Sequence, residues 1–337
     1  MRTKKHLKKK RKRRIILETV LSVLILLAIS LGAVSGYYGS KVLNFLDTIS
    51  EEEDTQTEEE IVQNNEQIKN AEPFSVLILG IDEEDEGASR SDTIIVATLN
   101  PNTDSMKLVS VPRDTFITLP GGKMEKINAA YASGRSLLAR EMVSQYLGIP
   151  IDFYAGLNFE GLVKLVDAVD GVTVRPEFNF SWDGHQFKNQ GPQKINGEEA
   201  LAYARMRKKD PRGDFGRQDR QKEVIVSILK KLNSTKSVKN FNQILDAIGP
   251  YLKTNARTEQ MVGMALSYSS VLRNIDQITL DGEGRRTYVP SYGKELWIWE
   301  ANEFALKDVQ NELKNHLEIK VIGPNRSMNA DGSSDSN

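Results

Sequence analysis

The sequence predicts an α/β fold: an α/β/α sandwich with a central mixed sheet covered by helices, preceded by one transmembrane helix. Three observations support this prediction. Short runs rich in β-branched residues, "FSVLILG", "TIIVATL" and "MKLVSV", open the folded part and have the composition of buried strands. Longer apolar segments with helical spacing follow them. An uncharged stretch of twenty residues, Thr19–Tyr38, has the length needed to span a bilayer.

The N-terminal segment predicts the topology. "MRTKKHLKKKRKRR" holds ten Lys/Arg residues and no acid, which marks its side of the membrane as cytoplasmic. We therefore expect a basic cytoplasmic tail at residues 1–14, a transmembrane helix at 15–38, and the rest of the chain outside a cell membrane that it crosses once. Two alternatives are a signal peptide cleaved near "AVS" at Ala33–Ser35 and a basic arm that binds nucleic acid.

Composition divides the remaining chain. Residues 39–72 are acidic and polar, which predicts an extracellular stalk, and residues 323–337 predict a disordered tail. Residues 73–322 are expected to form the folded extracellular domain.

The absence of cysteine excludes thiol catalysis, cysteine-ligated zinc, iron–sulfur clusters and disulfides. The three histidines are too scattered to suggest a zinc site.

Carboxylates follow the first predicted strand and begin the second. Asp82 closes "LGID", Asp92 closes "SRSD", and Arg90 stands in the loop between them. If the two strands pair antiparallel, these residues lie at one end of the sheet. Two converging carboxylates without His or Cys favour a hard cation such as Mg²⁺. The alternative is simple solvation of the strand ends.

Charged residues also follow the third strand. Pro112 ends it in "SVPRDT", and Arg113 and Asp114 leave the sheet together. Lys126 comes near the start of the helix predicted from "INAAYASGRSLLAREMVSQYLG", which Gly148 ends. A helix start with a nearby cation suits an anion. The alternatives are a surface Arg113–Asp114 pair and a solvated Lys126.

Further helices are expected in the second half. "NFEGLVKLVDAVDGV" has Asn158 as a possible N-cap and Gly171 at its end. "NGEEALAYA" begins another helix, and "FGRQDRQKEVIVSILKKL" is a long amphipathic one. "KNFNQILDAIGPYLKTN" and "TEQMVGMALSYSSVLRN" follow, and late strands such as "QITLDG" close the domain.

The stretch "RMRKKDPRGDFGRQDRQ" concentrates cations. "YARMR" alternates with the period of a strand, which predicts that Arg205 and Arg207 point the same way. "DPRGDFG" is a turn, with Asp214 as N-cap of the next helix. That helix carries an apolar stripe, and its first turn places Arg217 and Gln221 inside the stripe's arc and Arg220 at its edge. The stripe comprises Val224, Ile225, Ile228, Leu229 and Leu232.

A buried arginine requires a partner, and two partners are possible. One is a structural network with Asp210, Asp214 and Asp219. The other is a phosphate or pyrophosphate, which guanidiniums and a helix start bind well. The apolar face of the helix continues from this point, which favours a phosphate that carries a long hydrophobic group.

These motifs resemble the LytR–CpsA–Psr (LCP) family of Gram-positive envelope proteins. The matching segments are "LILGID", "SRSDTIIVATLNP", "LVSVPRDT", "KINAAYASG", "LVDAVDGV", "NGEEALAYARMR" and "DFGRQDRQ". The resemblance implies an α/β/α sandwich with an apolar tunnel for a polyprenyl chain. It implies an enzyme that transfers an anionic glycopolymer (wall teichoic acid, capsule or another wall polysaccharide) from undecaprenyl pyrophosphate to peptidoglycan, with release of undecaprenyl phosphate.

The resemblance also implies residue roles. Asp82 and Asp92 would hold Mg²⁺ or Mn²⁺ against the pyrophosphate of the bound polyprenyl substrate. Arg113 and Arg217 would be catalytic, with Asp214 as the base that deprotonates the acceptor hydroxyl. The pyrophosphate oxygens would be bound by Arg90, Arg113, Lys126, Arg205, Arg207, Arg217, Gln218 and Arg220.

Partners follow from this interpretation: the lipid-linked glycopolymer, peptidoglycan and the membrane. Nucleic acid is not expected, because the extracellular part is acidic. A pyrophosphatase or a lipid-binding envelope regulator that uses the same site is the alternative function.

Overall fold

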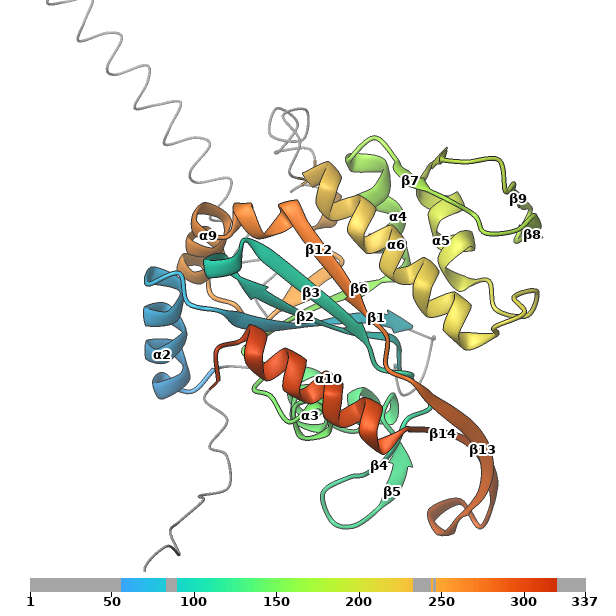
Figure 1. Ribbon diagram of the computed structural model, residues 1–337, viewed down its shortest axis with the longest axis horizontal. Helices are drawn as coiled ribbons and strands as arrows, with labels where there is room; N and C mark the ends of the chain where they lie inside the picture. The colour runs from blue at the N-terminus through green and yellow to red at the C-terminus, as the bar shows by residue number, and fades with distance from the viewer. Residues whose placement is uncertain (1–55, 83–89, 233–243, 245–246, 320–337) are drawn as a thin grey trace, which may run out of the picture.

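A computed structural model describes residues 56–82, 90–232, 244 and 247–319. A six-stranded sheet lies at its centre, with the strand order β11-β6-β1-β2-β3-β12 (Figure 1). β1 pairs antiparallel with β2 and parallel with β6, so the sheet is mixed, as the sequence predicts. The strands are β1 (Phe74–Asp82), β2 (Arg90–Asn100), β3 (Ser105–Ser110), β6 (Phe153–Asn158), β11 (Leu252–Thr254) and β12 (Asn274–Ile278).

Helices cover both faces of this sheet, which confirms the predicted layers (Figure 1). α3 (Ala129–Leu147) and α10 (Glu303–His316) lie on one face. On the other are α4 (Phe159–Ala168), α5 (Gly197–Arg205), α6 (Asp214–Leu232) and α9 (Thr258–Ser267). Alternation along β1 sends Leu77 and Leu79 into the first core and Phe74 into the second, because successive side chains of a strand point to opposite faces.

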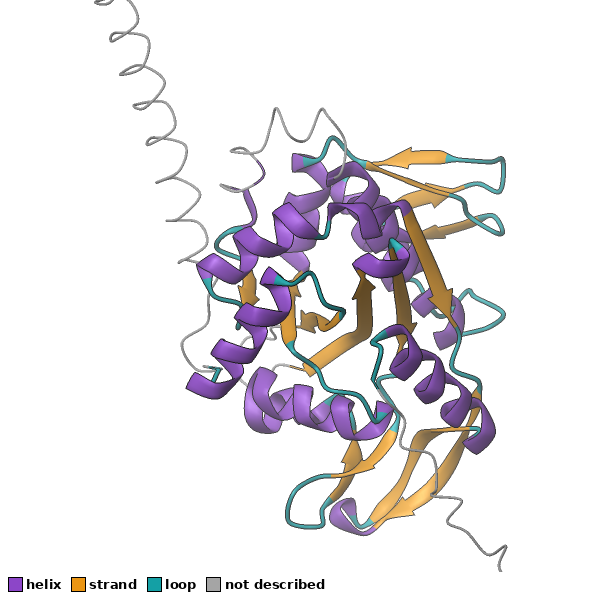
Figure 2. Cartoon of the chain, turned by 60° about the vertical axis from the view of Figure 1, so that its left-hand side comes forward, coloured by secondary structure: helices purple, strands orange, loops and turns teal. Residues whose placement is uncertain are grey.

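Small β-ribbons stand at the ends of the sandwich (Figure 2). They pair as β4 with β5, β7 with β10, β8 with β9 and β13 with β14. Their bounds are β4 (Phe116–Thr118), β5 (Met124–Lys126), β7 (Val172–Val174), β8 (Phe180–Trp182), β9 (His185–Phe187), β10 (Gln193–Ile195), β13 (Gly282–Val289) and β14 (Lys294–Ala301). The described residues also include three 3₁₀ turns: η1 (Pro101–Thr103), η2 (Ser269–Arg273) and η3 (Pro290–Tyr292).

The structure confirms the predicted N-cap of α4 and the predicted C-terminal glycine of α3. The Asn158 side chain accepts a hydrogen bond from the Gly161 N–H at the start of α4. Gly148 ends α3 in the left-handed region, at φ 62°. These signals depend on neighbours within one turn, which explains why the sequence reveals them.

One helix lies within the residues assigned to the stalk. α2 (Glu58–Lys69) carries a capping box between Thr57 and Glu60, and its Ile68 packs into the core beside β1 and α9. The folded unit therefore begins before residue 73. The predicted tails and the span at 15–38 lie outside the described residues, among which no helix is long and apolar enough to cross a membrane.

The strand predicted for "YARMR" is wrong. α5 continues through these residues to Arg205, and Met206 is its C-cap. A capping box between Asn196 and Glu199 starts this helix, and packing of Ala200 and Tyr203 in the core stabilises it. Five alternating residues are too few to outweigh a helix with a strong start and a buried face.

Candidate functional site

The candidate site lies at the edge of the sheet where β1 ends and β2 begins. Asp82 and Arg90 are register partners in this antiparallel pair, and Asp92 lies two residues further along β2. The two carboxylates therefore share one end of the sheet, as the sequence predicts. A bulge follows Gly80, where an added Cβ would lie 2.8 Å from the Thr93 Cβ.

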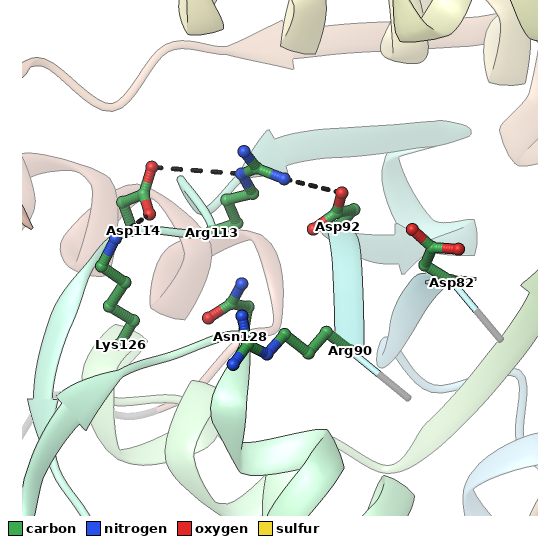
Figure 3. Close-up of a pocket in the computed structure, with 7 residues that line it drawn as sticks. All are labelled: Asp82, Arg90, Asp92, Arg113, Asp114, Lys126 and Asn128. Carbon is green, nitrogen blue, oxygen red and sulfur yellow. Dashed lines mark hydrogen bonds and ion pairs between the residues drawn. The ribbon is translucent and has the colours of Figure 1, made fainter. Parts of the chain in front are cut away.

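Arg113 and Lys126 approach this end from the loop after β3 and from β5. The Arg113 Nη1 lies 2.6 Å from the Asp92 Oδ2, and the Lys126 Nζ lies 2.7 Å from the Asp114 Oδ1 (Figure 3). Lys126 ends β5 and is not part of α3. Burial lowers the pKa of Arg113, but the charge and hydrogen bond of Asp92 outweigh it, so that pKa is raised.

A cavity of about 510 Å³ lies between these groups. It is lined by Asp82, Arg90, Asp92, Arg113, Asp114, Lys126 and Asn128 (Figure 3). Five of these seven were predicted site residues, whereas Asp114 had no assigned role and Asn128 was missed because an asparagine before a helix is usually only a cap. The Asp82 and Asp92 carboxyl groups lie next to one another in Figure 3.

Arg217 connects the first turn of α6 to β2. Its Nη2 donates to the Asp92 backbone oxygen at 3.4 Å and lies 2.9 Å from the Asp214 Oδ1. The side chain is only 8% exposed, and its Nε has no hydrogen-bond partner within the part of the chain that the structure describes. Burial lowers the pKa of Arg217, and Asp214 offsets this only in part. The buried charge is thus incompletely compensated, which favours an additional anion.

Asp214 is the first residue of α6, not the N-cap expected from the sequence. Gly213, with φ 59°, precedes it and turns the chain into the helix. The Asp214 Oδ2 accepts a hydrogen bond from the Gln218 Nε2 at 3.0 Å, and Oδ1 faces Arg217. The carboxylate is thus held by side chains of its own helix.

The structure separates Arg205 from Arg207. Arg205 ends α5, and its guanidinium carbon lies 4.7 Å from the centre of the Phe159 ring. Arg207 lies beyond the helix, with its Nη1 3.9 Å from the Asp214 Oδ1. They do not share a strand face, because the helical spacing and the turn after Met206 replace the predicted alternation.

Arg220, a predicted pyrophosphate ligand, does not line the charged cavity. Its guanidinium is buried, pairs with the Asp210 carboxylate and donates to the backbone oxygens of Tyr203 and Met206. It closes the C-terminal end of α5, whose last carbonyls need donors. The structure thus shows the internal network for Arg220, whereas Arg217 does not line the cavity either but contacts the backbone of Asp92, which does.

An apolar cavity of about 240 Å³ lies between the sheet and helices α4, α5 and α6. The predicted stripe of α6, from Val224 to Leu232, lines it, together with Ile78, Leu157, Leu162 and Leu201. Arg205 and Gln221 also line it and provide polar groups. Gln221 was not assigned a role, although its position in the stripe's arc was the available signal.

A third opening, a groove of about 620 Å³, adjoins the charged cavity and shares Arg113, Asp114 and Lys126 with it. Its other predicted residues are Arg207, Asp214 and Gln218. Phe215, Trp297 and Trp299 line it as well. Sequence reasoning missed the two tryptophans, for which the alternation in "ELWIWEA" was the only signal.

Fold and site together define an α/β protein with a cavity lined by three cations and three carboxylates and, on the same sheet, an apolar cavity. A model of the LytR_cpsA_psr family matches residues 39–315, and the chain belongs to this family. A relative named "Polyisoprenyl-teichoic acid--peptidoglycan teichoic acid transferase TagU", from Bacillus subtilis strain 168, is 36% identical over 92% of this chain and 98% of its own length. The relative of that name from Enterococcus faecalis is 44% identical over 75% of this chain and 82% of its own length.

Solved structures agree with this assignment. The crystal structure of TagU from B. subtilis has a TM-score of 0.58 and 38% identity, and the match covers 75% of this chain and all (100%) of that one. A structure of TagT described as bound to LIIa-WTA has a TM-score of 0.62 and 30% identity, with 74% of this chain and 92% of that one covered.

Proposed function

We propose that this protein transfers an anionic glycopolymer from a polyprenyl pyrophosphate carrier, undecaprenyl pyrophosphate in the family, to peptidoglycan. The names of the relatives support a teichoic acid as the polymer. One observation supports the proposal most strongly. A single helix, α6, contributes Arg217 to the charged end of the site and its apolar stripe to the adjoining cavity. A prenyl pyrophosphate has this same division into anion and hydrocarbon.

The reaction is a phosphoryl transfer. The acceptor hydroxyl attacks the phosphorus attached to the glycan, a new P–O bond forms, and the bond from that phosphorus to the bridging oxygen breaks. The lipid monophosphate leaves with the bridging oxygen, and Asp214 takes the proton of the hydroxyl. Arg113 and Arg217 offset the charge that grows on the leaving phosphate, which is the main requirement of such a transfer.

Asp82 and Asp92 are proposed to hold Mg²⁺ or Mn²⁺. The donor set fits, because Mg²⁺ is commonly bound through one or two carboxylates plus substrate phosphates and waters. Within the residues that the structure describes, no group of three or more His, Asp or Glu forms a complete cage, so the substrate would complete the shell. When bound, the ion would neutralise phosphate charge.

The proposed location is the outer face of a cell membrane. The apolar segment at 15–38, uncharged from Thr19 onward, would anchor the chain, with the basic residues 1–14 on the cytoplasmic side. This places the apolar cavity on the same side as a lipid-linked polymer presented outside the cell.

The test is transfer by the purified full-length chain. The chain receives a synthetic prenyl-pyrophosphate-linked polymer, peptidoglycan oligomers and Mg²⁺, and mass spectrometry follows the phosphodiester product and the lipid. We expect product from the native chain and almost none from Asp82→Ala, whereas Asp308→Ala, an exposed acid on α10, retains it. Free glycan phosphate without attachment would identify a pyrophosphatase. Bound but unchanged lipid in all variants would identify a lipid-binding protein.

A further inference from the structure

The β13–β14 hairpin contributes Gly284, Trp297 and Trp299 to the groove beside the site. It lies next to the β4–β5 ribbon and is fixed to the site loops (Figure 1). The backbone N–H of Trp299 donates a hydrogen bond to the backbone oxygen of Asp114 at 2.9 Å. At the other end, the Tyr292 hydroxyl donates to the Glu125 Oε2 at 2.5 Å. The hairpin is therefore held at both ends against the segment that carries Arg113 and Lys126.

Trp297 presents an aromatic surface in this groove. It shares a strand face with Trp299, because residues two apart in a strand point the same way. Trp299 is 4% exposed and packs into the core, whereas Trp297 is 52% exposed. An added Cβ on Gly284 would lie 2.2 Å from the Trp297 Cζ2, so the indole lies against bare backbone of β13. Gly284 thus allows the ring to lie against the hairpin while much of it faces solvent.

Polar side chains stand opposite this surface. Arg207, Asp214 and Gln218 line the same groove. An aromatic face beside hydrogen-bonding side chains suits a sugar ring, whose C–H face is apolar and whose edge carries hydroxyl and amide groups.

We propose that this groove binds the glycan strand of the peptidoglycan acceptor, with one N-acetylhexosamine ring stacked on Trp297. The inference rests on the proposed function. The acceptor is favoured over the donor glycan because Asp214, the proposed base, lines this groove and neither the charged nor the apolar cavity. The leaving lipid phosphate departs toward the apolar cavity, and in-line attack brings the acceptor from another side.

Binding tests the inference without turnover. The full-length chain is titrated calorimetrically with an oligosaccharide of alternating N-acetylglucosamine and N-acetylmuramic acid that carries neither lipid nor phosphate. We expect Trp297→Ala to weaken binding about tenfold, the effect of losing one good aromatic contact. Trp297→Phe should retain part of the affinity, and Gly284→Ala should lower it by displacing the ring. Trp182→Ala, in the β8–β9 ribbon, is the matched control.

The remaining outcomes separate the two proposals. In the transfer assay, Trp297→Ala should raise the KM for the acceptor and leave that for the lipid-linked donor unchanged. Equal oligosaccharide binding by the native chain and Trp297→Ala would overturn the inference, as would native chain that does not bind the oligosaccharide at all. A donor KM that rises instead would assign the groove to the donor glycan and also overturn it. Oligosaccharide binding that depends on Trp297 in a chain without transfer would support the groove and reject the proposed function.

Discussion

Arg217 donates a hydrogen bond to the Asp92 backbone oxygen, and this contact joins residues 125 positions apart in the sequence. It brings the first turn of α6 to the start of β2, where Arg113 already pairs with the Asp92 carboxylate. Asp92 is therefore contacted by two guanidiniums, one from each half of the domain. Carboxylates outweigh burial at Arg113, whose pKa is raised, but not at Arg217, whose pKa is lowered, so a further anion would stabilise the Arg217 charge.

Replacement of Arg217 should therefore reduce transfer more than it reduces stability. We expect Arg217→Lys to lower the transfer rate by at least about a hundredfold, the usual loss when a positioned donor to developing charge is removed. Rates are measured with the lipid-linked polymer, and chain integrity is checked by thermal unfolding. Lys230→Ala, on the exposed side of the same helix, should be unaffected. A folded Arg217→Lys protein with native rate would contradict this role.

Arg220 should show the opposite behaviour. Arg220→Ala leaves the buried Asp210 carboxylate without its partner, so the free energy of unfolding should fall by about 3–5 kcal/mol. Urea unfolding measures the change. Arg212→Ala, which removes exposed ion pairs to Asp219 and Glu177, should cost less than about 1 kcal/mol. An Arg220→Ala chain that unfolds at the native urea concentration would show that the buried pair has no structural role.

The apolar cavity can be tested by filling it. Leu162 lines the cavity and is partly exposed, so Leu162→Trp should fold while occupying the space of a hydrocarbon chain. Affinity for a long-chain prenyl pyrophosphate should fall at least about tenfold, because each excluded methylene forfeits burial energy. A short-chain analogue should bind as before. Leu266→Trp, at a position 78% exposed on α9, is the control. Equal loss for both chain lengths would mean that the phosphate site had been disturbed instead.

His316 predicts a pH dependence of stability. Its ring nitrogens contact the Thr98 and Ser105 hydroxyls at 2.7 and 2.9 Å, and burial, with Lys107 nearby, lowers the pKa of His316 below its ordinary 6.5. The histidine of the unfolded chain then binds a proton at a higher pH than His316 does in the folded chain. The contribution of His316 to the free energy of unfolding is therefore full above pH 6.5 and is lost as the pH falls toward the lower pKa of the folded chain.

Urea unfolding at a series of pH values between 7.5 and 5 measures this effect. The contribution of one such group cannot exceed about 1.4 kcal/mol per pH unit. His316→Gln should flatten the decline in the free energy of unfolding, whereas the control His185→Gln, in the β8–β9 ribbon, should not change that decline. An unchanged slope in His316→Gln would show that other groups cause the decline.

Local patterns account for what the sequence predicts well. The strand ends at Asp82 and Asp92, the caps at Asn158 and Gly148 and the apolar stripe of α6 each depend on spacing within one element. The convergence of Asp82, Asp92 and Arg90 follows once β1 and β2 are taken as an antiparallel pair, and the cavity that they line together confirms it.

Tertiary contacts decide the remainder. Arg217 and Arg220 are three residues apart and both buried, yet one joins the site and the other closes α5, because Asp210 lies on only one side of the helix. The strand predicted at Arg205 was wrong because a capped helix start outweighs a short alternation. Trp297 joins the site because its hairpin is fixed to the site segment by Trp299 at Asp114 and by Tyr292 at Glu125, contacts over long separations that no local pattern indicates.

That backbone contact also bears on the order of assembly. Every ionic group of the charged cavity lies between residues 82 and 126, but the segment bearing Asp114 gains its partner from Trp299, close to the end of the described chain. A growing polypeptide therefore holds this loop only by contacts within residues 92–128 until β14 has been synthesised. Any chain interrupted before that strand would carry all of the cavity's charged groups and still lack the brace that keeps the loop in place.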